Sequence, residues 1–160
     1  TVSGGGSIFL CDVLARAKKM KYICCHHEQA AAFAGEAYAR LRGFGVTLVT
    51  SGPGATNAIT GCAASWLDSV AHLFISVQAF FEQTIRHRAR LDYQGLRQMG
   101  VQEVNIVPMV QPITKWATVI EPRSGIEYEM EQAYRIATTP RCGPVWLDIP
   151  GDTQNRKMND

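Results

Sequence analysis

The chain has 160 residues, with 16 Lys and Arg against 14 Asp and Glu, which gives a net charge of +2 at pH 7. Apolar residues make up 46% and charged residues 19%, ordinary values for a globular protein, and the length suffices for one hydrophobic core. A nearly neutral chain has no electrostatic reason to bind nucleic acid or an anionic membrane surface. No apolar run approaches the roughly 20 residues of a membrane-spanning helix, so we expect a soluble domain.

The five cysteines include no CxxC pair, and no secretory signal opens the chain. A reduced, cytoplasmic compartment is the simplest interpretation. Residues 24–27 (CCHH) offer metal-binding side chains, but neighbours in an extended segment point to opposite faces, so we predict no metal site there. The basic run at residues 86–90 contains no aromatic partner for a base, and we expect a solvated loop.

In chain order, helical and strand patterns alternate. A glycine-rich turn at residues 4–7 opens the first helix, and a short β-prone run at 22–25 leads into the second. The predicted helices cover 8–17, 28–42, 55–67, 104–110 and 126–137, and the predicted strands cover 46–50, 73–77, 113–120 and 143–150. The spacing is that of successive βαβ units, which predicts an α/β fold with a parallel β-sheet and helices on both faces.

We expect residues 1–150 to form one domain and residues 151–160 to be a linker toward a domain that this chain lacks. The polar stretch at 78–102 has weak periodicity and is expected to be a functional loop. Because Thr1 falls inside a strand-to-helix turn, we also expect a helix and most of a first strand to precede it and to be missing.

Glu28 sits where a β-prone run becomes a helix. The positive end of the helix dipole favours its charged form. The apolar positions behind it (30, 33, 34, 37, 38 and 41) follow helical spacing, and we expect them to exclude water, which favours the protonated form. Such a carboxyl group suits acid–base chemistry. From this segment alone, a glutamate that merely complements the helix dipole is the favoured interpretation, and the loop at residues 50–57 is what shifts the balance.

The loops at residues 4–7 and 51–54, together with Glu28, fall at the predicted carboxyl edge of the sheet, where open α/β sheets bind ligands. Residues 51–54 are no Walker motif, because no Gly-Lys-Ser/Thr follows. They are no dinucleotide fingerprint either, because Asn57 occupies the position of the third glycine. Glycine allows a flat ligand to approach the backbone, and Pro53 fixes the turn. A tight turn packed on its own helix is the alternative.

Taken together, five segments are much more specific than any one of them. They are residues 27–31 (HEQAA), 37–40 (AYAR), 49–57 (VTSGPGATN), 66–69 (WLDS) and 143–150 (GPVWLDIP). In this order they resemble the pyrimidine-binding domain of thiamine diphosphate enzymes, in particular acetolactate synthase and its relatives.

The resemblance implies that Glu28 is catalytic. The matching glutamate holds a nitrogen of the cofactor's pyrimidine ring and thereby lets thiamine diphosphate act as its own base. It further implies that Thr50, Pro53 and Asn57 line the pyrimidine pocket, that Ser3 is a cofactor contact in the first loop, and that Gln78 lies near the reacting centre. The implied reaction is the carboligation of a small 2-oxo acid.

The sequence departs from that family at two loops. Ser3 stands where the family usually has the proline of Pro-Gly-Gly, and Gln78 is followed by Ala79-Phe80, where acetolactate synthases typically continue with valine and proline. The Gly-Asp-Gly motif of the diphosphate site and its downstream asparagines are missing, so the ligands of Mg2+ are expected outside this chain.

The resemblance therefore implies half a cofactor site. A diphosphate-binding domain of the same or another subunit would complete it in a homo-oligomer, presumed here to be a dimer. FAD is compatible with the resemblance, but no residue of this chain supports it. Two alternatives stay open. One is a 2-oxo acid decarboxylase, as a domain or a separate subunit, and the other is a non-catalytic interaction domain that keeps the fold.

Overall fold

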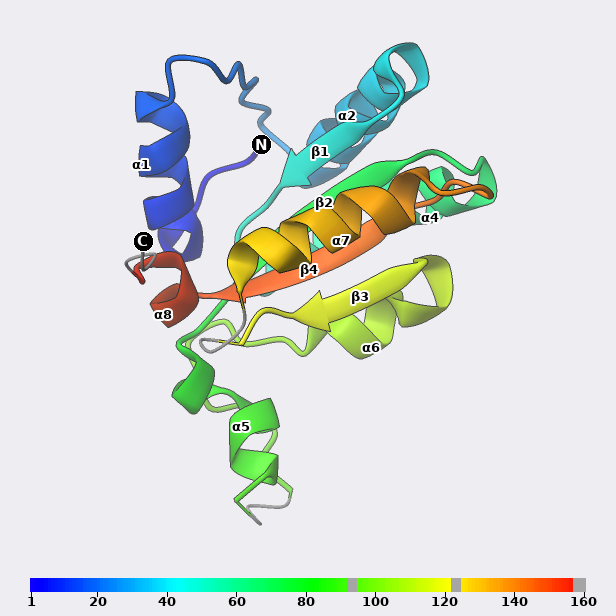
Figure 1. Cartoon of the computed structure of the whole chain (residues 1–160). Coiled ribbons are helices and arrows are strands. Elements are labelled where there is room, and N and C mark those ends of the chain that lie inside the picture. Colours follow the sequence, from blue (N-terminus) through cyan, green and yellow to red (C-terminus); the bar gives the residue numbers. More distant parts are fainter. Residues whose placement is uncertain (92–94, 122–124, 157–160) are drawn as a thin grey trace.

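Four parallel strands form a single sheet (Figure 1). The computed structural model describes residues 1–91, 95–121 and 125–156. Strands β1 (Gly45–Leu48), β2 (His72–Gln78), β3 (Trp116–Val119) and β4 (Val145–Pro150) lie in the order β1-β2-β4-β3. Leu73 of β2 and Trp116 of β3 both pair with Val145, and every pairing is parallel. The predicted α/β fold with a parallel sheet is confirmed.

Burial distinguishes the central strands from the edges. All six residues of β4 are buried, and in β2 only Ile75 is partly exposed, whereas Val46 of the edge strand β1 faces solvent. Strands covered on both faces read as continuous apolar runs, which is why residues 73–77 and 145–149 were recognisable in the sequence.

The helices divide between the two faces of the sheet. They are α1 (Ile8–Arg16), α2 (Glu28–Arg42), α3 (Pro53–Asn57), α4 (Ile59–Leu67), α5 (Ile85–Ala89), α6 (Ile106–Val110), α7 (Ile126–Thr138) and α8 (Gly151–Gln154), with 3₁₀ turns η1 (Gly5–Ser7), η2 (Phe81–Gln83) and η3 (Gln111–Ile113). One core joins α2, α3, α4 and α6 to the sheet, and a second joins α7 and Leu10 of α1 to the other face. Helices thus cover both faces, as predicted.

A buried histidine connects β1, β2 and α4 through hydrogen bonds. His72 Nε2 lies 2.9 Å from Thr47 Oγ1, and His72 Nδ1 lies 3.0 Å from Ser65 Oγ. The Thr47 hydroxyl also donates to Ala31 O, so it accepts from Nε2–H while Ser65 donates to Nδ1. Burial lowers the pKa of His72 to about 3, and the ring is therefore neutral. Its function is to satisfy polar groups inside the core.

Helix α2 presents its apolar stripe outward, which corrects one expectation. Phe33, Tyr38 and Leu41 are 44%, 57% and 83% exposed, and the alanines at 30, 34 and 37 are exposed as well. The face that packs on the sheet and on α4 consists of small residues, with Ala32 so close to Gly61 that a Cβ there would collide with it. The outward stripe does not exclude water from Glu28 within this chain.

Other boundaries differ in detail. The helix predicted over 55–67 is two helices, α3 and α4, which meet at Ala58. Residues 22–25 form no strand, because they pair only with Thr1, which bonds Ile23 O and Cys25 N. Of the expected linker, residues 151–154 form α8 and residues 157–160 lie outside the described residues, as do 92–94 of the expected loop. Within the described ranges no helix is long and apolar enough to cross a membrane.

Candidate functional site

Two glycine loops and the start of α2 meet at the carboxyl edge of the sheet. A Cβ on Gly4 would collide with Thr50, and one on Gly6 would lie 2.9 Å from Ser51 Oγ, so the first loop packs on the second. A Cβ on Gly54 would lie 2.6 Å from Thr50 Cγ2 and 3.5 Å from Glu28 Oε1. Glycine at 4 and 54 therefore lets the two loops pack closely on Thr50, and Gly54 brings bare backbone next to Glu28.

Glu28 is the first residue of α2 and is partly buried. Asn57 Nδ2 donates a hydrogen bond of 2.6 Å to Glu28 Oε2. Gln29 Nε2 donates to Asn57 Oδ1 at 3.4 Å, which sets the orientation of the Asn57 amide. Glu28 Oε1 accepts no hydrogen bond from any described residue and lies beside the backbone of Gly54. The carboxyl group is thus held at one oxygen and available at the other.

Pro53 occupies the first position of α3, where its missing N–H costs nothing. In the turn before it, two features require glycine at position 52. Gly52 has φ +56°, and a Cβ there would collide with Gln102 O. The chain that carries Gln102 therefore lies directly on the 51–54 turn.

Ser3 and Gln78 are less directly connected to Glu28. Ser3 is exposed and forms no side-chain hydrogen bond within the described ranges. The Gln78 amide is used by the scaffold, because Nε2 donates to Val104 O at 2.8 Å and to Asp148 Oδ2 at 3.3 Å. Its Oε1 accepts from Ala79 N at 3.0 Å. The structure thus brings together Glu28, Thr50, Asn57 and the Pro53 turn, and leaves Ser3 and Gln78 at the margin.

Asp148 was not singled out by the sequence, and it is the partner that holds Gln78. Ser76 Oγ donates to Asp148 Oδ1 at 2.6 Å, and Trp146 Nε1 donates to Ser76 Oγ at 2.8 Å. Burial raises the pKa of Asp148 to about 6, although the hydrogen bonds from Ser76 and Gln78 act in the opposite direction. Its neighbours in β4 are apolar, and nothing in the sequence around Asp148 indicated that this acidic side chain is fully buried.

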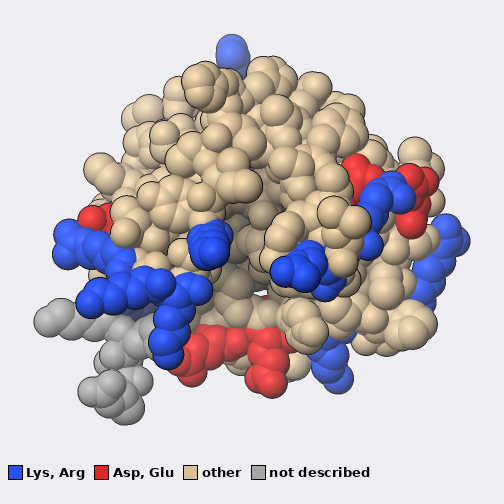
Figure 2. Space-filling view, turned by 90° about the horizontal axis from the view of Figure 1, so that it is seen from above, with Lys and Arg blue, Asp and Glu red and all other residues tan. Residues whose placement is uncertain are grey.

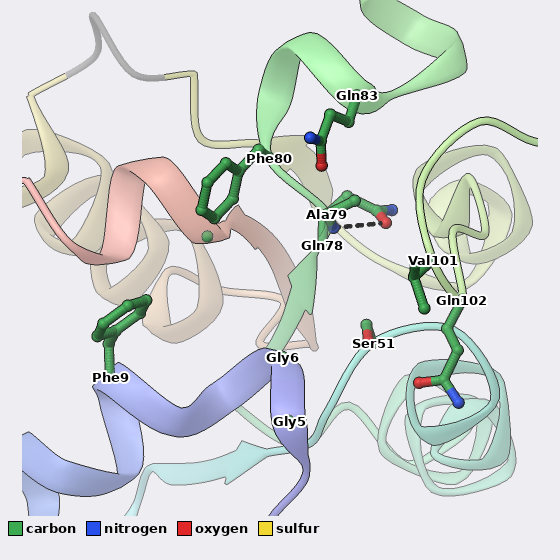
Figure 3. A pocket seen from close by; sticks show the side chains of 11 residues that line it. Gly5, Gly6, Phe9, Ser51, Gln78, Ala79, Phe80, Gln83, Val101 and Gln102 are labelled. Atoms are coloured by element: carbon green, nitrogen blue, oxygen red, sulfur yellow. Dashed lines mark hydrogen bonds between the residues drawn. The ribbon is translucent and has the colours of Figure 1, made fainter.

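A cavity of about 310 Å³ adjoins the glycine loops (Figure 3). Gly5, Gly6 and Ser51 line its floor, while Val101 and Gln102 stand on one side and Phe9 and Phe80 on the other. Gln102 has φ +54°, unusual for a residue with a side chain, and strain of this kind clusters at functional sites. Sequence reasoning missed Gln102, because its contact with the 51–54 turn joins segments 50 residues apart.

Glu103 fixes the chain that carries Gln102. Its buried carboxylate accepts hydrogen bonds from the backbone N–H groups of Ile85, Met99 and Gly100, at 2.5, 2.9 and 3.0 Å. Three backbone donors on one carboxylate hold residues 85 and 99–103 in one arrangement. The long polar stretch is therefore structured at its end, where it reaches the cavity.

The basic run at residues 86–90 is paired with acid. Arg90 forms two hydrogen bonds to Glu121 and lies over the ring of Phe81, and Arg86 lies 3.8 Å from Glu121. The hydrogen bond from Arg90 lowers the pKa of Glu121. On the face shown in Figure 2, Lys and Arg stand in separate groups with acidic side chains beside two of them, around a largely uncharged surface. This face offers no continuous basic track.

The surroundings of Glu28 offer few metal ligands. Gly54 and Thr50 lie next to it, and they contribute bare backbone and one hydroxyl group. Within the described ranges no three His, Cys, Asp or Glu side chains gather closely enough to hold a metal.

A parallel sheet with helices on both faces, and with its candidate residues gathered at the carboxyl edge, defines an α/β domain of the doubly covered class, in which ligands bind at that edge. The particular family follows from sequence comparison: the chain belongs to the thiamine pyrophosphate enzymes as their N-terminal TPP binding domain, whose family model matches residues 1–109.

Relatives of known name agree with this membership. The chain is 35% identical to the acetolactate synthase of Arthrospira platensis over 98% of its own length and 26% of that protein. It is 35% identical to the acetolactate synthase large subunit of Buchnera aphidicola subsp. Schizaphis graminum, over 93% of the chain and 24% of that protein. With the large subunit of Lactococcus lactis the identity is 34%, over 98% and 25%. The chain thus spans about a quarter of the length of these relatives.

Proposed function

We propose that this chain supplies the pyrimidine-binding half of the site of a thiamine diphosphate-dependent 2-oxo acid carboligase that resembles acetolactate synthase. The observation that carries the proposal is the Glu28 carboxyl group, held at Oε2 by Asn57 and without a hydrogen bond from the described residues at Oε1, which lies beside the bare backbone of Gly54. Bound there, the cofactor would supply a stabilised carbanion equivalent for carbonyl chemistry.

Each nearby residue has a separate task in this proposal. Glu28 exchanges a proton with a ring nitrogen through Oε1, which biases the ring toward the tautomer that can act as a base. Asn57 fixes the rotamer of Glu28, and Thr50 together with the Pro53 turn sets the width of the slot. Ser3 and Gln78 contribute more distantly, Ser3 in the first loop and Gln78 beside the cavity.

The other half of the site would come from a diphosphate-binding domain, which also supplies the ligands of Mg2+. The outward stripe of α2 supports such a partner. Phe33, Tyr38 and Leu41 present apolar surface on the same helix that carries Glu28 at its first residue. Covering this stripe would bury apolar surface and close Glu28 off from water at the same time. A homodimer in the cytoplasm is the simplest assembly that provides this cover.

The proposal is tested in the complete enzyme with Glu28→Gln. We expect turnover of pyruvate to fall at least about 100-fold, since positioned acid–base groups contribute on the order of 10²–10⁴. Proton exchange at the reactive carbon of bound thiamine diphosphate, followed by NMR in D₂O, should slow to a similar extent. The matched control is Glu127→Gln, an exposed glutamate in the first turn of α7. Unaltered exchange in Glu28→Gln would refute the assignment.

A further inference from the structure

We propose that the cavity beside the glycine loops takes the side chain of a 2-oxo acid that ends in an aromatic ring, with Phe9 and Phe80 as the residues that select it. This inference names the substrate class of the site proposed above and so rests on that function.

The cavity has the size and position for a substrate side chain. Its volume of about 310 Å³ is roughly twice that of a cavity of about 150 Å³ known to hold benzene. It shares Ser51 with the turn that leads through Pro53 to Asn57, and Gly5 and Gly6 of its lining belong to the 4–7 loop that packs on Thr50. A ligand bound beside the two glycine loops can therefore extend into it.

Two phenyl rings form one wall of this cavity (Figure 3). Phe9 is 37% exposed and Phe80 is 50% exposed, so both rings that line the cavity keep apolar surface uncovered in this chain. Covering that surface with an apolar group is favourable. Planar apolar groups pack on such rings by offset or edge contacts.

The wall is built into the fold. A Cβ on Gly151 would lie 2.7 Å from Phe80 Cε1, so the ring rests on the bare backbone at the start of α8. Gln154 of α8 donates to Gly6 O at 3.1 Å and to Ile149 O at 2.9 Å, which ties the loop before Phe9 to the end of β4. Both rings are thus carried by one connected part of the structure.

The opposite side supplies the polar end. Gln102 stands there beside Val101, and its amide forms no hydrogen bond to any described residue. The Gln78 amide, by contrast, is fully engaged by Val104, Asp148 and Ala79. A carboxylate or carbonyl oxygen would accordingly bind on the Gln102 and Ser51 side, while the apolar end of the same molecule lies against Phe9 and Phe80.

The test compares phenylpyruvate with pyruvate in the complete thiamine diphosphate enzyme. We expect Phe80→Ala and Phe9→Ala each to lower the ratio of kcat/KM for phenylpyruvate over pyruvate about tenfold, the effect of losing one ring face from an apolar pocket. Phe80→Leu should lose less. The control is Tyr128→Ala, which removes an exposed aromatic ring from α7 and should leave the ratio unchanged.

A second readout separates this inference from the proposed function. Binding of phenylpyruvate is measured by calorimetry in the Glu28→Gln enzyme, with and without Phe80→Ala. Binding that weakens about tenfold with Phe80→Ala supports the aromatic wall even if no 2-oxo acid is turned over. An equal loss for both substrates, an unchanged ratio, or a partner domain found packed on Phe9 and Phe80 would overturn it.

Discussion

Glu28 and Asp148 are two carboxyl groups near the same edge of the sheet, and the chain treats them in opposite ways. Asp148 lies inside β4 and is bonded through both oxygens, to Ser76 and to Gln78. Glu28 starts a helix, is partly buried, and is bonded through one oxygen to Asn57. The first group is completed by its own domain, and the second is left with an oxygen for something else.

This difference shows how a single domain separates stability from chemistry. A fully paired buried acid contributes to a unique core, and its removal leaves orphaned donors. A half-paired acid contributes little to folding and can change its proton partner. The raised pKa of Asp148 therefore marks burial in the core, whereas Glu28, with one oxygen free of hydrogen bonds from the described residues, is the carboxyl group for which we propose a catalytic role.

The largest expected effect that tests this comparison is on stability. Asp148→Ala should lower the free energy of unfolding by about 3 kcal/mol, because it leaves a cavity and removes the acceptor of the Ser76 hydroxyl. Glu28→Ala should change it by less than about 1 kcal/mol, as is usual for a partly exposed side chain. Urea unfolding of the two variants and the parent checks this. Equal losses would mean that Glu28 is a structural residue as well.

A second prediction uses pH. The folded pKa of Asp148 is raised to about 6 from an ordinary 3.8, so the folded state holds a proton that the unfolded state has lost, and stability falls as pH rises from about 4 to 6. The pKa of His72 is lowered from 6.5 to about 3, so its contribution is lost as pH falls below about 6.5. Between pH 4 and 6 the two slopes oppose each other.

Asp148→Asn should therefore expose the slope due to His72. Relative to the parent, its free energy of unfolding should improve by roughly 3 kcal/mol between pH 4 and 6.5, following about 1.4 kcal/mol per pKa unit. His72→Gln should show the reverse, with stability falling as pH rises through the same window. Urea titrations at several pH values measure both, and a pH-independent difference between Asp148→Asn and the parent would contradict the burial argument.

The smallest effect concerns the partner of Glu28. Asn57→Ala frees the Glu28 side chain to adopt other rotamers, and one hydrogen bond to a charged group is worth about 1.5 kcal/mol or somewhat more. We expect thiamine diphosphate to bind roughly tenfold more weakly to the complete enzyme, with most of the turnover retained at saturating cofactor. The dissociation constant, from tryptophan quenching, decides this. Thr60→Ala, on the exposed side of α4, is the control.

Much of the fold was predictable because it follows from local sequence patterns such as apolar runs and helix-ending residues. The mostly apolar runs at 73–77 and 145–149 indicated buried strands, and Gly43 with φ +87° ends α2 as its position after Arg42 indicated. Of the strand predicted over 113–120, only Trp116–Val119 forms β3. Lys115 lies just before it, and its Nζ donates to the carbonyl groups of Ile136 and Thr139 at the end of α7.

The site was predictable only in part. Glu28, Thr50, Asn57 and the Pro53 turn belong to strong sequence motifs, and the structure places them together at the carboxyl edge of the sheet. Asp148, Gln102 and Glu103 act through contacts across 50 or more residues or through several backbone donors, and no local pattern encodes such contacts. The outward face of α2 could not be assigned either, since helical spacing identifies a stripe but not what covers it.

That stripe also constrains how the chain can change over time. On the inner side of α2, Ala32 and Gly61 are in such close contact that either can enlarge only if the other gives way, so the two positions should vary together within this domain. Phe33, Tyr38 and Leu41 are exposed instead. If the partner domain proposed above covers them, their substitutions in a large set of related sequences should covary with residues of that domain, and the covariation would identify the surface that packs on this helix.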